Sequence, residues 1–354
     1  MLLASVVAPQ GAIGGQPMHI PDGYFGPLFS IAMLVIALPW LALAVRQLSR
    51  QLNQRMVPLV ALFAAFSFVI MMFNVPLVGG TTGHAIGATI AAIVIGPAGA
   101  AVAVSIALLI QALFFGDGGI LAYGANILLM ALIMPYVASF IYRAVSGATP
   151  IASGRRVLAS FAAGWASLSL IAGLAGIFFG LQPLLFHAAD GTALYAPFPL
   201  AVSVPAMLIP HMLVASVIEG LVTAGIVLYL QRSNPGLLEL TYKPDAANAI
   251  NNRRLRPLWI GLAALIILSP LGLLAGGSAW GEWAADEIAD IVGYTPQGMA
   301  DAGGWQAPLP DYSIAGMNPV ASYILSAVVG IGLTLFVIWG ISTLLARRTA
   351  VRKS

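Results

Sequence analysis

Four histidines offer the main ligand chemistry in this sequence of 354 residues, because it contains no cysteine. His19 lies in the stretch Met-His-Ile-Pro-Asp-Gly-Tyr, just before an apolar run, and His84 lies in the glycine-rich stretch Gly-Gly-Thr-Thr-Gly-His-Ala-Ile-Gly. Imidazole suits late first-row divalent metals when thiolates are absent. Taken singly, His19 is interpreted as an exposed terminal residue and His84 as a loop residue bonded to a backbone carbonyl. Together they predict a shared metal site on the outer side.

The two other histidines are weaker candidates. His211 follows Pro210 inside an apolar run, where it either orients a metal ligand or hydrogen-bonds between helices. His187 lies near Asp190 in a polar stretch and is interpreted as a solvated loop residue. Only His211 is added to the predicted site, as a supporting residue.

Acidic side chains give two further expectations. Glu219 is the one acid inside an apolar run, and such groups are costly in a membrane and often functional. It lies toward the predicted inner end, where pairing with a cytoplasmic Arg explains it equally well. Glu282, Asp286 and Asp290 recur every four residues and are expected on one solvated face of a short helix, with metal collection as the alternative.

The composition requires a membrane. Hydrophobic residues make up 60% of the chain and charged residues 8%, with a mean hydropathy of +0.96, whereas soluble domains carry about a quarter charged residues. A soluble enzyme is excluded, and an all-α polytopic membrane protein in a lipid bilayer is predicted. The net charge of +3 arises from short basic clusters between apolar runs, so topology explains it and no nucleic-acid partner is expected.

Motifs for catalysis are missing from the sequence. The two lysines, Lys243 and Lys353, do not follow glycine, so the phosphate-binding Gly-Lys-Ser/Thr motif is absent. The zinc-protease, dinucleotide and serine-hydrolase motifs are absent too. We expect a chain that is not an enzyme, has no cofactor and cannot hydrolyse ATP by itself.

Long apolar runs predict the membrane crossings, since about 20 apolar residues span a bilayer. A shorter segment, 85–95, is separated from the next run by Gly96-Pro97 and is predicted to be a short or partly re-entrant crossing. Nine segments, with the N-terminus outside and the C-terminus cytoplasmic, put all 15 Lys and Arg inside and nine of the 12 acids outside. The longer runs are 27–45, 57–78, 98–115, 121–142, 157–181, 200–230, 257–275 and 319–345.

Polar stretches divide the chain into four parts. Residues 1–17 form an N-terminal extension, 18–231 a seven-helix core, and 232–256 a cytoplasmic linker. Residues 257–354 form a module of two further transmembrane helices, whose outer loop, 276–318, carries most of the outer acids. No strong internal repeat is found, which argues against the inverted-repeat secondary transporters.

Several of these motifs resemble the substrate-binding component of energy-coupling factor transporters for nickel or cobalt, over about residues 18–240. The tail is similar to the two-helix accessory subunit of the same systems, here fused to the core. The stretches that carry the resemblance are Met-His-Ile-Pro-Asp-Gly-Tyr at 18–24, Gly-Gly-Thr-Thr-Gly-His at 79–84, Gly-Pro at 96–97, Pro-His-Met at 210–212, Glu-Gly at 219–220, Ser-Pro-Leu-Gly-Leu at 269–273 and Trp-Gly-Glu-Trp at 280–283.

That family holds its metal with the amine of an N-terminal Met, the amide nitrogen and imidazole of the next His, and a second His from the glycine-rich loop. The resemblance implies Met18, His19 and His84 for these roles. An amine, the adjacent backbone nitrogen and an imidazole form fused chelate rings, and a fourth nitrogen completes the square plane typical of Ni(II) or Cu(II). Binding is expected to weaken as pH falls, because the donors must lose protons. Ni²⁺ and Co²⁺ remain alternatives.

The 17 residues before Met18 depart from this pattern, because they turn the Met18 nitrogen into an amide. They include no Lys or Arg and no clear A-x-A cleavage site, so they make a poor signal peptide. We expect a start assigned too far upstream, with Met18 as the initiator; processing is the alternative.

The resemblance also implies a function and partners. We expect high-affinity binding and translocation of Ni²⁺ or Co²⁺ in the cytoplasmic membrane, with a link to cobalamin biosynthesis, a separate transmembrane coupling protein and two cytoplasmic ATPase subunits. An ion-coupled secondary transporter or channel without ATPases is the alternative. It needs ionisable groups near the middle of the membrane, and only Glu219 is a candidate. For the fused pair of helices, analogy suggests a role in metal loading.

Overall fold

The structure is a computed structural model that describes residues 18–51, 56–240, 255–302 and 305–351. The N-terminal extension 1–17 and most of the linker 232–256 lie outside these residues. Within the described ranges, seven helices are long and apolar enough to cross a membrane, and one shorter apolar helix covers Val57–Met71. The predicted class, an all-α membrane protein, is confirmed.

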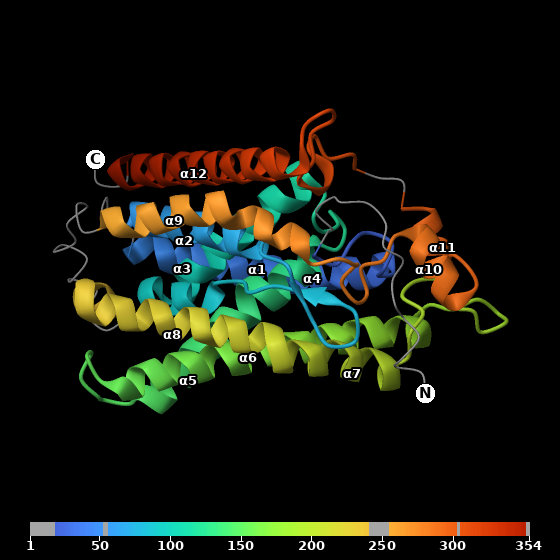
Figure 1. Cartoon of the computed structure of the whole chain (residues 1–354), viewed down its shortest axis with the longest axis horizontal. Coiled ribbons are helices and arrows are strands. Elements are labelled where there is room, and N and C mark those ends of the chain that lie inside the picture. The colour runs from blue at the N-terminus through green and yellow to red at the C-terminus, as the bar shows by residue number, and fades with distance from the viewer. Residues whose placement is uncertain (1–17, 52–55, 241–254, 303–304, 352–354) are drawn as a thin grey trace.

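Most helices run along the long axis of the molecule, and the short helices α10 and α11 gather at its right-hand end in Figure 1. Short π-helical and 3-10 segments (η) interrupt or extend several of them. The described elements are α1 (Pro27–Gln51), α2 (Val57–Met71), β1 (Val75–Pro76), β2 (Thr82–Gly83), α3 (Ala88–Ile110), η1 (Gln111–Phe115), α4 (Tyr123–Asn126), η2 (Ile127–Ile133), α5 (Met134–Ser146), α6 (Gly154–Leu185), α7 (Leu200–Pro210), η3 (His211–Ala215), α8 (Ser216–Ser233), η4 (Pro235–Glu239), α9 (Arg256–Leu268), η7 (Ser269–Leu274), α10 (Ala285–Val292), α11 (Gln297–Ala300), η8 (Pro310–Tyr312) and α12 (Pro319–Val351).

Local signals explain where several of these helices begin. Proline stands in the first turn of α2 and of α9 and is the first residue of α1 and of α12, where its missing N–H costs nothing. Ser153 caps α6 by accepting a hydrogen bond from the Arg155 amide at 3.2 Å. The side chain of Asn318 does the same for α12, through the Val320 amide at 2.9 Å.

The chain reverses its direction at Gly96, within α3. Gly96 has φ 79° and ψ 161°, which glycine adopts at little cost. A straight helix from Ala88 to Phe115 would be about 40 Å long at 1.5 Å per residue. His84 and Asp117, which flank its two ends, both contact the backbone of Met18. The halves on either side of Gly96 therefore run in opposite directions.

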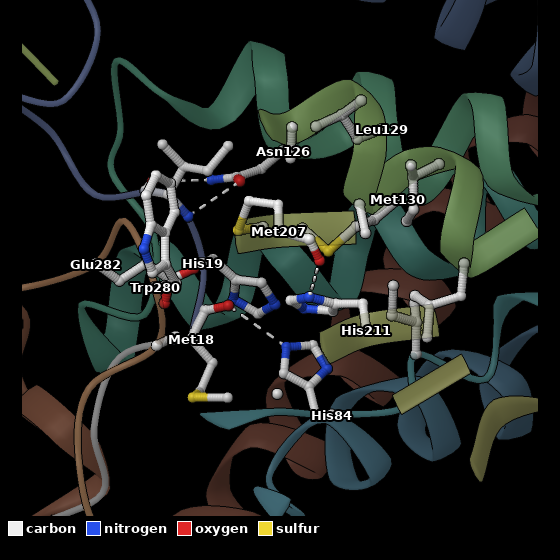
Figure 2. Close-up of a pocket in the computed structure, with 18 of the residues that line it drawn as sticks. Met18, His19, His84, Asn126, Leu129, Met130, Met207, His211, Trp280 and Glu282 are labelled. Carbon is white, nitrogen blue, oxygen red and sulfur yellow. Dashed lines mark hydrogen bonds between the residues drawn. The ribbon is translucent and has the colours of Figure 1, made fainter. Parts of the chain in front are cut away.

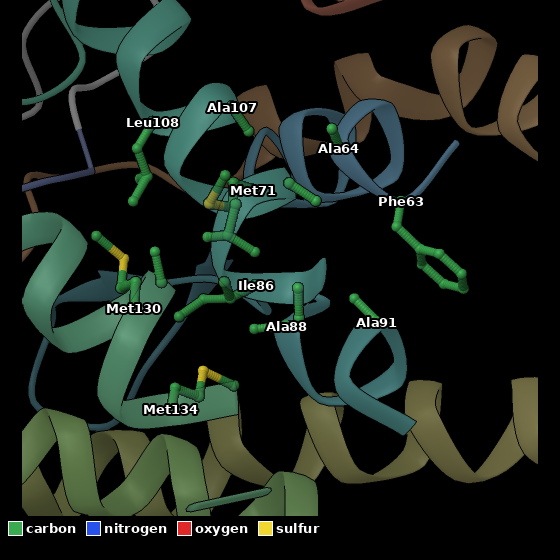
Figure 3. Close-up of a cluster of buried hydrophobic side chains, with 14 of the residues drawn as sticks. Phe63, Ala64, Met71, Ile86, Ala88, Ala91, Ala107, Leu108, Met130 and Met134 are labelled. Atoms are coloured by element: carbon green, nitrogen blue, oxygen red, sulfur yellow. The ribbon is translucent and has the colours of Figure 1, made fainter. Parts of the chain in front are cut away.

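A tightly packed core surrounds the start of α3. Small and flexible side chains from α2, α3, η2 and α5 point into a common cluster, which Figure 3 shows around Ile86 and Met71. Alanines such as Ala64, Ala88 and Ala91 let the helices approach closely. The start of α3, just after His84, is thus fixed by dense packing.

The helices of the C-terminal module lie against the core. The Tyr323 hydroxyl on α12 donates a hydrogen bond to the Met72 carbonyl at 2.9 Å. Gly272 in η7 lies on the same carbonyl so closely that a side chain would clash with it. Both C-terminal helices therefore pack beside α2.

Two expectations about local structure are corrected. The run predicted at 57–78 ends its helix at Met71, because the chain turns into the small antiparallel hairpin of β1 and β2. Glu282 does not share a helical face with Asp286 and Asp290, because α10 begins only at Ala285. Asp286 and Asp290 are exposed on α10, whereas Glu282 is buried.

Candidate metal-binding site

The segment Met18–Ile20 is threaded into the protein interior. Its residues are only 6%, 2% and 5% exposed, so the interpretation of His19 as an exposed terminal residue is wrong. Asn126 holds the segment by pairing with both backbone groups of Ile20: it accepts from the amide at 3.3 Å and donates to the carbonyl at 3.1 Å. This leaves His19 fixed between two anchored neighbours.

Asp22 anchors the next turn of the N-terminal segment. Its carboxylate accepts hydrogen bonds from three successive backbone amides, at 3.0 Å from Ile120, 2.8 Å from Leu121 and 3.0 Å from Ala122. Gly119 lies so close to Asp22 that a Cβ there would overlap its backbone nitrogen. The Asp-Gly of the N-terminal motif thus docks onto the loop that follows η1.

Asp117 is a buried carboxylate that joins three parts of the chain. Its Oδ1 accepts a hydrogen bond from the Met18 nitrogen at 2.7 Å and lies 2.9 Å from His19 Nδ1, and its Oδ2 accepts from the Tyr312 hydroxyl at 2.6 Å. Burial favours the neutral acid, but the contacts with His19, Tyr312 and Met18 outweigh it and lower the pKa of Asp117 to about 2. No motif in the sequence predicts this role for Asp117.

His84 follows β2 and turns its ring toward the N-terminal segment. Nδ1 lies 3.1 Å from the Ala85 carbonyl and Nε2 lies 3.4 Å from the Met18 carbonyl. The shorter contact favours the proton on Nδ1, which leaves the lone pair of Nε2 facing Met18. Burial, with the nearby His19, lowers the pKa of His84 to about 4, so the ring is neutral at pH 7.

Glu219 of α8 holds the loop that carries His84. Its carboxylate accepts hydrogen bonds from the amides of Ile86 at 2.9 Å, Gly87 at 2.9 Å and Thr89 at 3.3 Å. An anion is well placed there, because these amides form the open N-terminus of α3. Of the two alternatives for Glu219, pairing with a cytoplasmic Arg is therefore wrong.

One cavity, of about 80 Å³, brings the predicted residues together. Met18, His19, His84 and His211 all line it, and Figure 2 shows the three imidazole rings turned toward one another. The ring centroids of His19 and His84 are 5.2 Å apart. The volume holds an ion with a few waters. His187 lies away from this cavity and is exposed, as expected.

Two features leave nitrogen lone pairs available in this cavity. Among the residues that the structure describes, neither ring nitrogen of His19 has a hydrogen-bond partner, although Nδ1 lies 2.9 Å from Oδ1 of Asp117. His211 is held by its Nδ1, 2.7 Å from the Met207 carbonyl, which leaves its Nε2 near Gly83, the residue before His84. His211 thus lies beside the strand that leads to His84.

The outer loop of the C-terminal module covers the cavity. Trp280 and Glu282 belong to its lining, and Figure 2 draws both on the side of Met18 and His19. The Trp280 amide donates to the Thr81 hydroxyl at 2.7 Å, next to β2. The sequence predicts an outer position for this loop but gives no sign that it covers the site.

Side chains alone do not form a metal site here. Across the described ranges, no group of three or more His, Cys, Asp or Glu is arranged to hold a metal ion. Any metal in this cavity would need further ligands besides these side chains, from backbone or terminal nitrogens or from water.

These features define a helical membrane protein with a small cavity lined by nitrogen donors and covered on one side by its own C-terminal loop. The family described as "Cobalt uptake substrate-specific transmembrane region" matches residues 19–237, and the "PDGLE domain" matches 255–347. The chain belongs to this cobalt-uptake family and carries a PDGLE domain after the family's transmembrane region. The resemblance found in the sequence is confirmed.

Relatives with the same two-part organisation cover nearly the whole chain. The "Fused nickel transport protein NikMN" of Rhodobacter capsulatus is 48% identical over 89% of this chain and 94% of its own length. The "Probable fused nickel transport protein LarMN" of Lactiplantibacillus plantarum is 40% identical over 92% and 97%. A crystal structure of a transition metal transporter is 45% identical, with a TM-score of 0.57 over 61% of this chain and 93% of that one.

Proposed function

We propose that this protein binds Ni²⁺ or Co²⁺ in the cavity between His19 and His84 and carries the ion across the cytoplasmic membrane. The observation that carries the proposal is the meeting of these two imidazoles, distant in sequence, in one buried cavity with ring centroids 5.2 Å apart. The names of the fused relatives favour nickel as the cargo.

The proposed ligands are the Met18 amine, the amide nitrogen and imidazole of His19, and Nε2 of His84. In support, Met18 and His19 are anchored by Asp117, and the Nδ1 contact of His84 leaves Nε2 open. His211 supports the site without binding the metal. The amine exists only in a protein that begins at Met18, so the N-terminal residue of the purified protein tests this ligand directly.

The energy source in this proposal is external. The chain acts as the substrate-specific subunit of an ATP-driven energy-coupling factor importer, with a separate transmembrane coupling protein and two cytoplasmic ATPases. The described helices, with the reversal at Gly96, accord with nine crossings, an outer N-terminus and a cytoplasmic C-terminus. The basic clusters then fall inside, as the positive-inside rule requires.

Uptake of radioactive nickel or cobalt by cells that produce all four subunits tests the proposal. We expect His84→Ala to abolish uptake while the protein still inserts in the membrane, and the matched control His187→Ala, in an exposed loop, to leave uptake unchanged. Normal uptake in His84→Ala refutes the site.

An ion-coupled transporter is the second candidate, and the bonds of Glu219 argue against it. A proton-carrying residue must lose and regain its partners, whereas Glu219 is held by three backbone amides. Uptake into vesicles that contain this chain alone, driven by a proton gradient, would support that candidate.

A further inference from the structure

Glu282 places a carboxylate from the C-terminal module inside the cavity of the proposed metal site. It lines the same cavity as Met18, His19 and His84, although it follows His84 by nearly 200 residues in the sequence. The residue is 9% exposed, so most of its side chain is buried. Glu282 therefore differs from Asp286 and Asp290, which are exposed on α10 and do not line the cavity.

Aromatic packing fixes the direction of this side chain. Trp280 and Trp283 lie on either side of Glu282 in the sequence. Their ring centroids are 5.5 Å apart, and both rings pack against Phe198. The Trp283 carbonyl accepts a hydrogen bond from the Tyr24 hydroxyl at 2.8 Å. Between the two tryptophans in the sequence, Gly281 has φ +82°, and a Cβ at this position would collide with the Phe179 ring. The backbone thus turns tightly at glycine and directs Glu282 inward.

One oxygen of the Glu282 carboxylate lacks a hydrogen-bond donor. Within the described part of the chain, Oε2 of Glu282 is buried without a hydrogen-bond partner. The other buried carboxylates of the region are satisfied: Asp117 accepts from Met18 and Tyr312, and Glu219 accepts from three amides. Glu282 is the exception that calls for a missing partner.

No basic side chain supplies that partner. The described residues that line the cavity include no Lys and no Arg. A buried carboxylate without a counter-charge is strongly unfavourable, whereas a divalent cation in the same cavity removes the penalty. The proposed nitrogen ligands bring one negative charge, that of the deprotonated His19 amide, which leaves a dication with a net positive charge that a neighbouring carboxylate can balance.

We infer that Glu282 faces the bound metal ion and balances its charge, so that the C-terminal module completes the metal site of the core. This inference rests on the proposed function, since it takes the cavity to be the metal site. It assigns the fused module a direct part in binding Ni²⁺ or Co²⁺. Because the side chains do not converge on a single point, Glu282 acts here as the charged neighbour of the ion.

The test compares variants of the purified full-length protein by competition with a chelator, with Ni²⁺ and Co²⁺ as the probes. Glu282→Gln keeps the shape but removes the charge, and Glu282→Asp keeps the charge on a shorter stem. Asp286→Asn, an exposed acid of the same loop, is the matched control. We expect a loss of affinity of about 10- to 100-fold for Glu282→Gln, a smaller loss for Glu282→Asp and none for Asp286→Asn.

The order of the two Glu282 variants separates charge from packing. If the side chain only fills space, Glu282→Asp is worse than Glu282→Gln, and that order overturns the inference. Wild-type affinity in Glu282→Gln overturns it too, while the proposed function stands if His84→Ala has lost binding in the same assay. If His84→Ala binds like the wild type, or the wild type binds neither ion, the proposed function fails and the inference fails with it.

Discussion

Replacing Glu219 with glutamine is expected to loosen the loop that carries His84 without touching the cavity itself. The carboxylate holds the amides of Ile86 and Gly87 through one oxygen, both at 2.9 Å, and the Thr89 amide through the other. A glutamine keeps one acceptor oxygen, and its NH₂ group must face at least one of these N–H donors. The start of α3 then loses both a charge and a partner.

The size of this loss follows from the three bonds. A hydrogen bond to a charged group contributes about 1.5–3 kcal/mol and a neutral one about 0.5–1.5 kcal/mol, and an anion at a helix N-terminus adds about 0.3–1 kcal/mol. Glu219→Gln should therefore cost about 2–4 kcal/mol. For a chain of this size, that corresponds to a fall in melting temperature of roughly 3–5 °C.

The assay measures two properties of the same detergent-purified variant. We expect the lower melting temperature together with a loss of Ni²⁺ or Co²⁺ affinity of about 10- to 100-fold, the range for partners that orient a metal ligand. Asp290→Asn, an exposed acid on α10, serves as the control and should change neither. A Glu219→Gln protein that melts within 1 °C of the wild type and binds metal normally would show that the carboxylate does not anchor the His84 loop.

Three more outcomes are expected. Asp117→Asn should weaken Ni²⁺ or Co²⁺ binding about 10- to 100-fold in chelator competition, because it no longer fixes both Met18 and His19; unchanged affinity would contradict this. Burial lowers the pKa of His84 to about 4, so the unfolded chain binds more protons than the folded one between pH 6.5 and 4. The free energy of unfolding of the metal-free protein should therefore fall by about 3 kcal/mol as pH falls through that window. A profile of melting temperature against pH that is no steeper than that of His84→Ala would refute this. Gly119→Ala should cost about 1–3 kcal/mol through its clash with Asp22, measured by thermal unfolding, whereas Gly225→Ala, with open space around it, should stay within about 1 kcal/mol.

Hydropathy alone predicts the class of this protein and most of its helices. The runs predicted at 157–181 and 200–230 appear as α6 and as the continuous stretch Leu200–Ser233, because an apolar segment of that length has no stable alternative to a helix in lipid. The sequence also predicts that the segment 85–95 ends at Gly96-Pro97, since this pair is a strong local turn signal. These features depend on neighbours in the sequence.

The site was only partly predictable, for the opposite reason. His19 and His84 stand in distinctive motifs, so they were found. Asp117 carries no such local signal: its partners Met18 and Tyr312 lie 99 and 195 residues away along the chain. Glu219 stands out as an acid in an apolar run, but its partners at the entry to α3, more than 100 residues away, cannot be deduced from its own surroundings.

Glu282 shows how a correct pattern can mislead. Its spacing from Asp286 and Asp290 fits a helical face, and acids in an outer loop are usually solvated. The helix starts three residues later, at Ala285, because Gly281 and the two flanking tryptophans impose their own backbone path. Packing against Phe179 and Phe198 decides this path, and neither residue is near it in the sequence.

The C-terminal module and the N-terminal segment depend on each other at Asp117. The Tyr312 hydroxyl and the Met18 nitrogen bind the same carboxylate, at 2.6 Å and 2.7 Å, so the loop that brings Tyr312 also steadies the residue that brings His19. The ring of Tyr312 stacks on Phe115 with centroids 4.8 Å apart, which fixes it to the end of α3 and η1. Moving the loop away from the core therefore removes the cover of the cavity and one of the three contacts of Asp117 together. Covalent fusion keeps the loop at a high effective concentration beside the core, which favours the closed arrangement in which both ends of the chain meet.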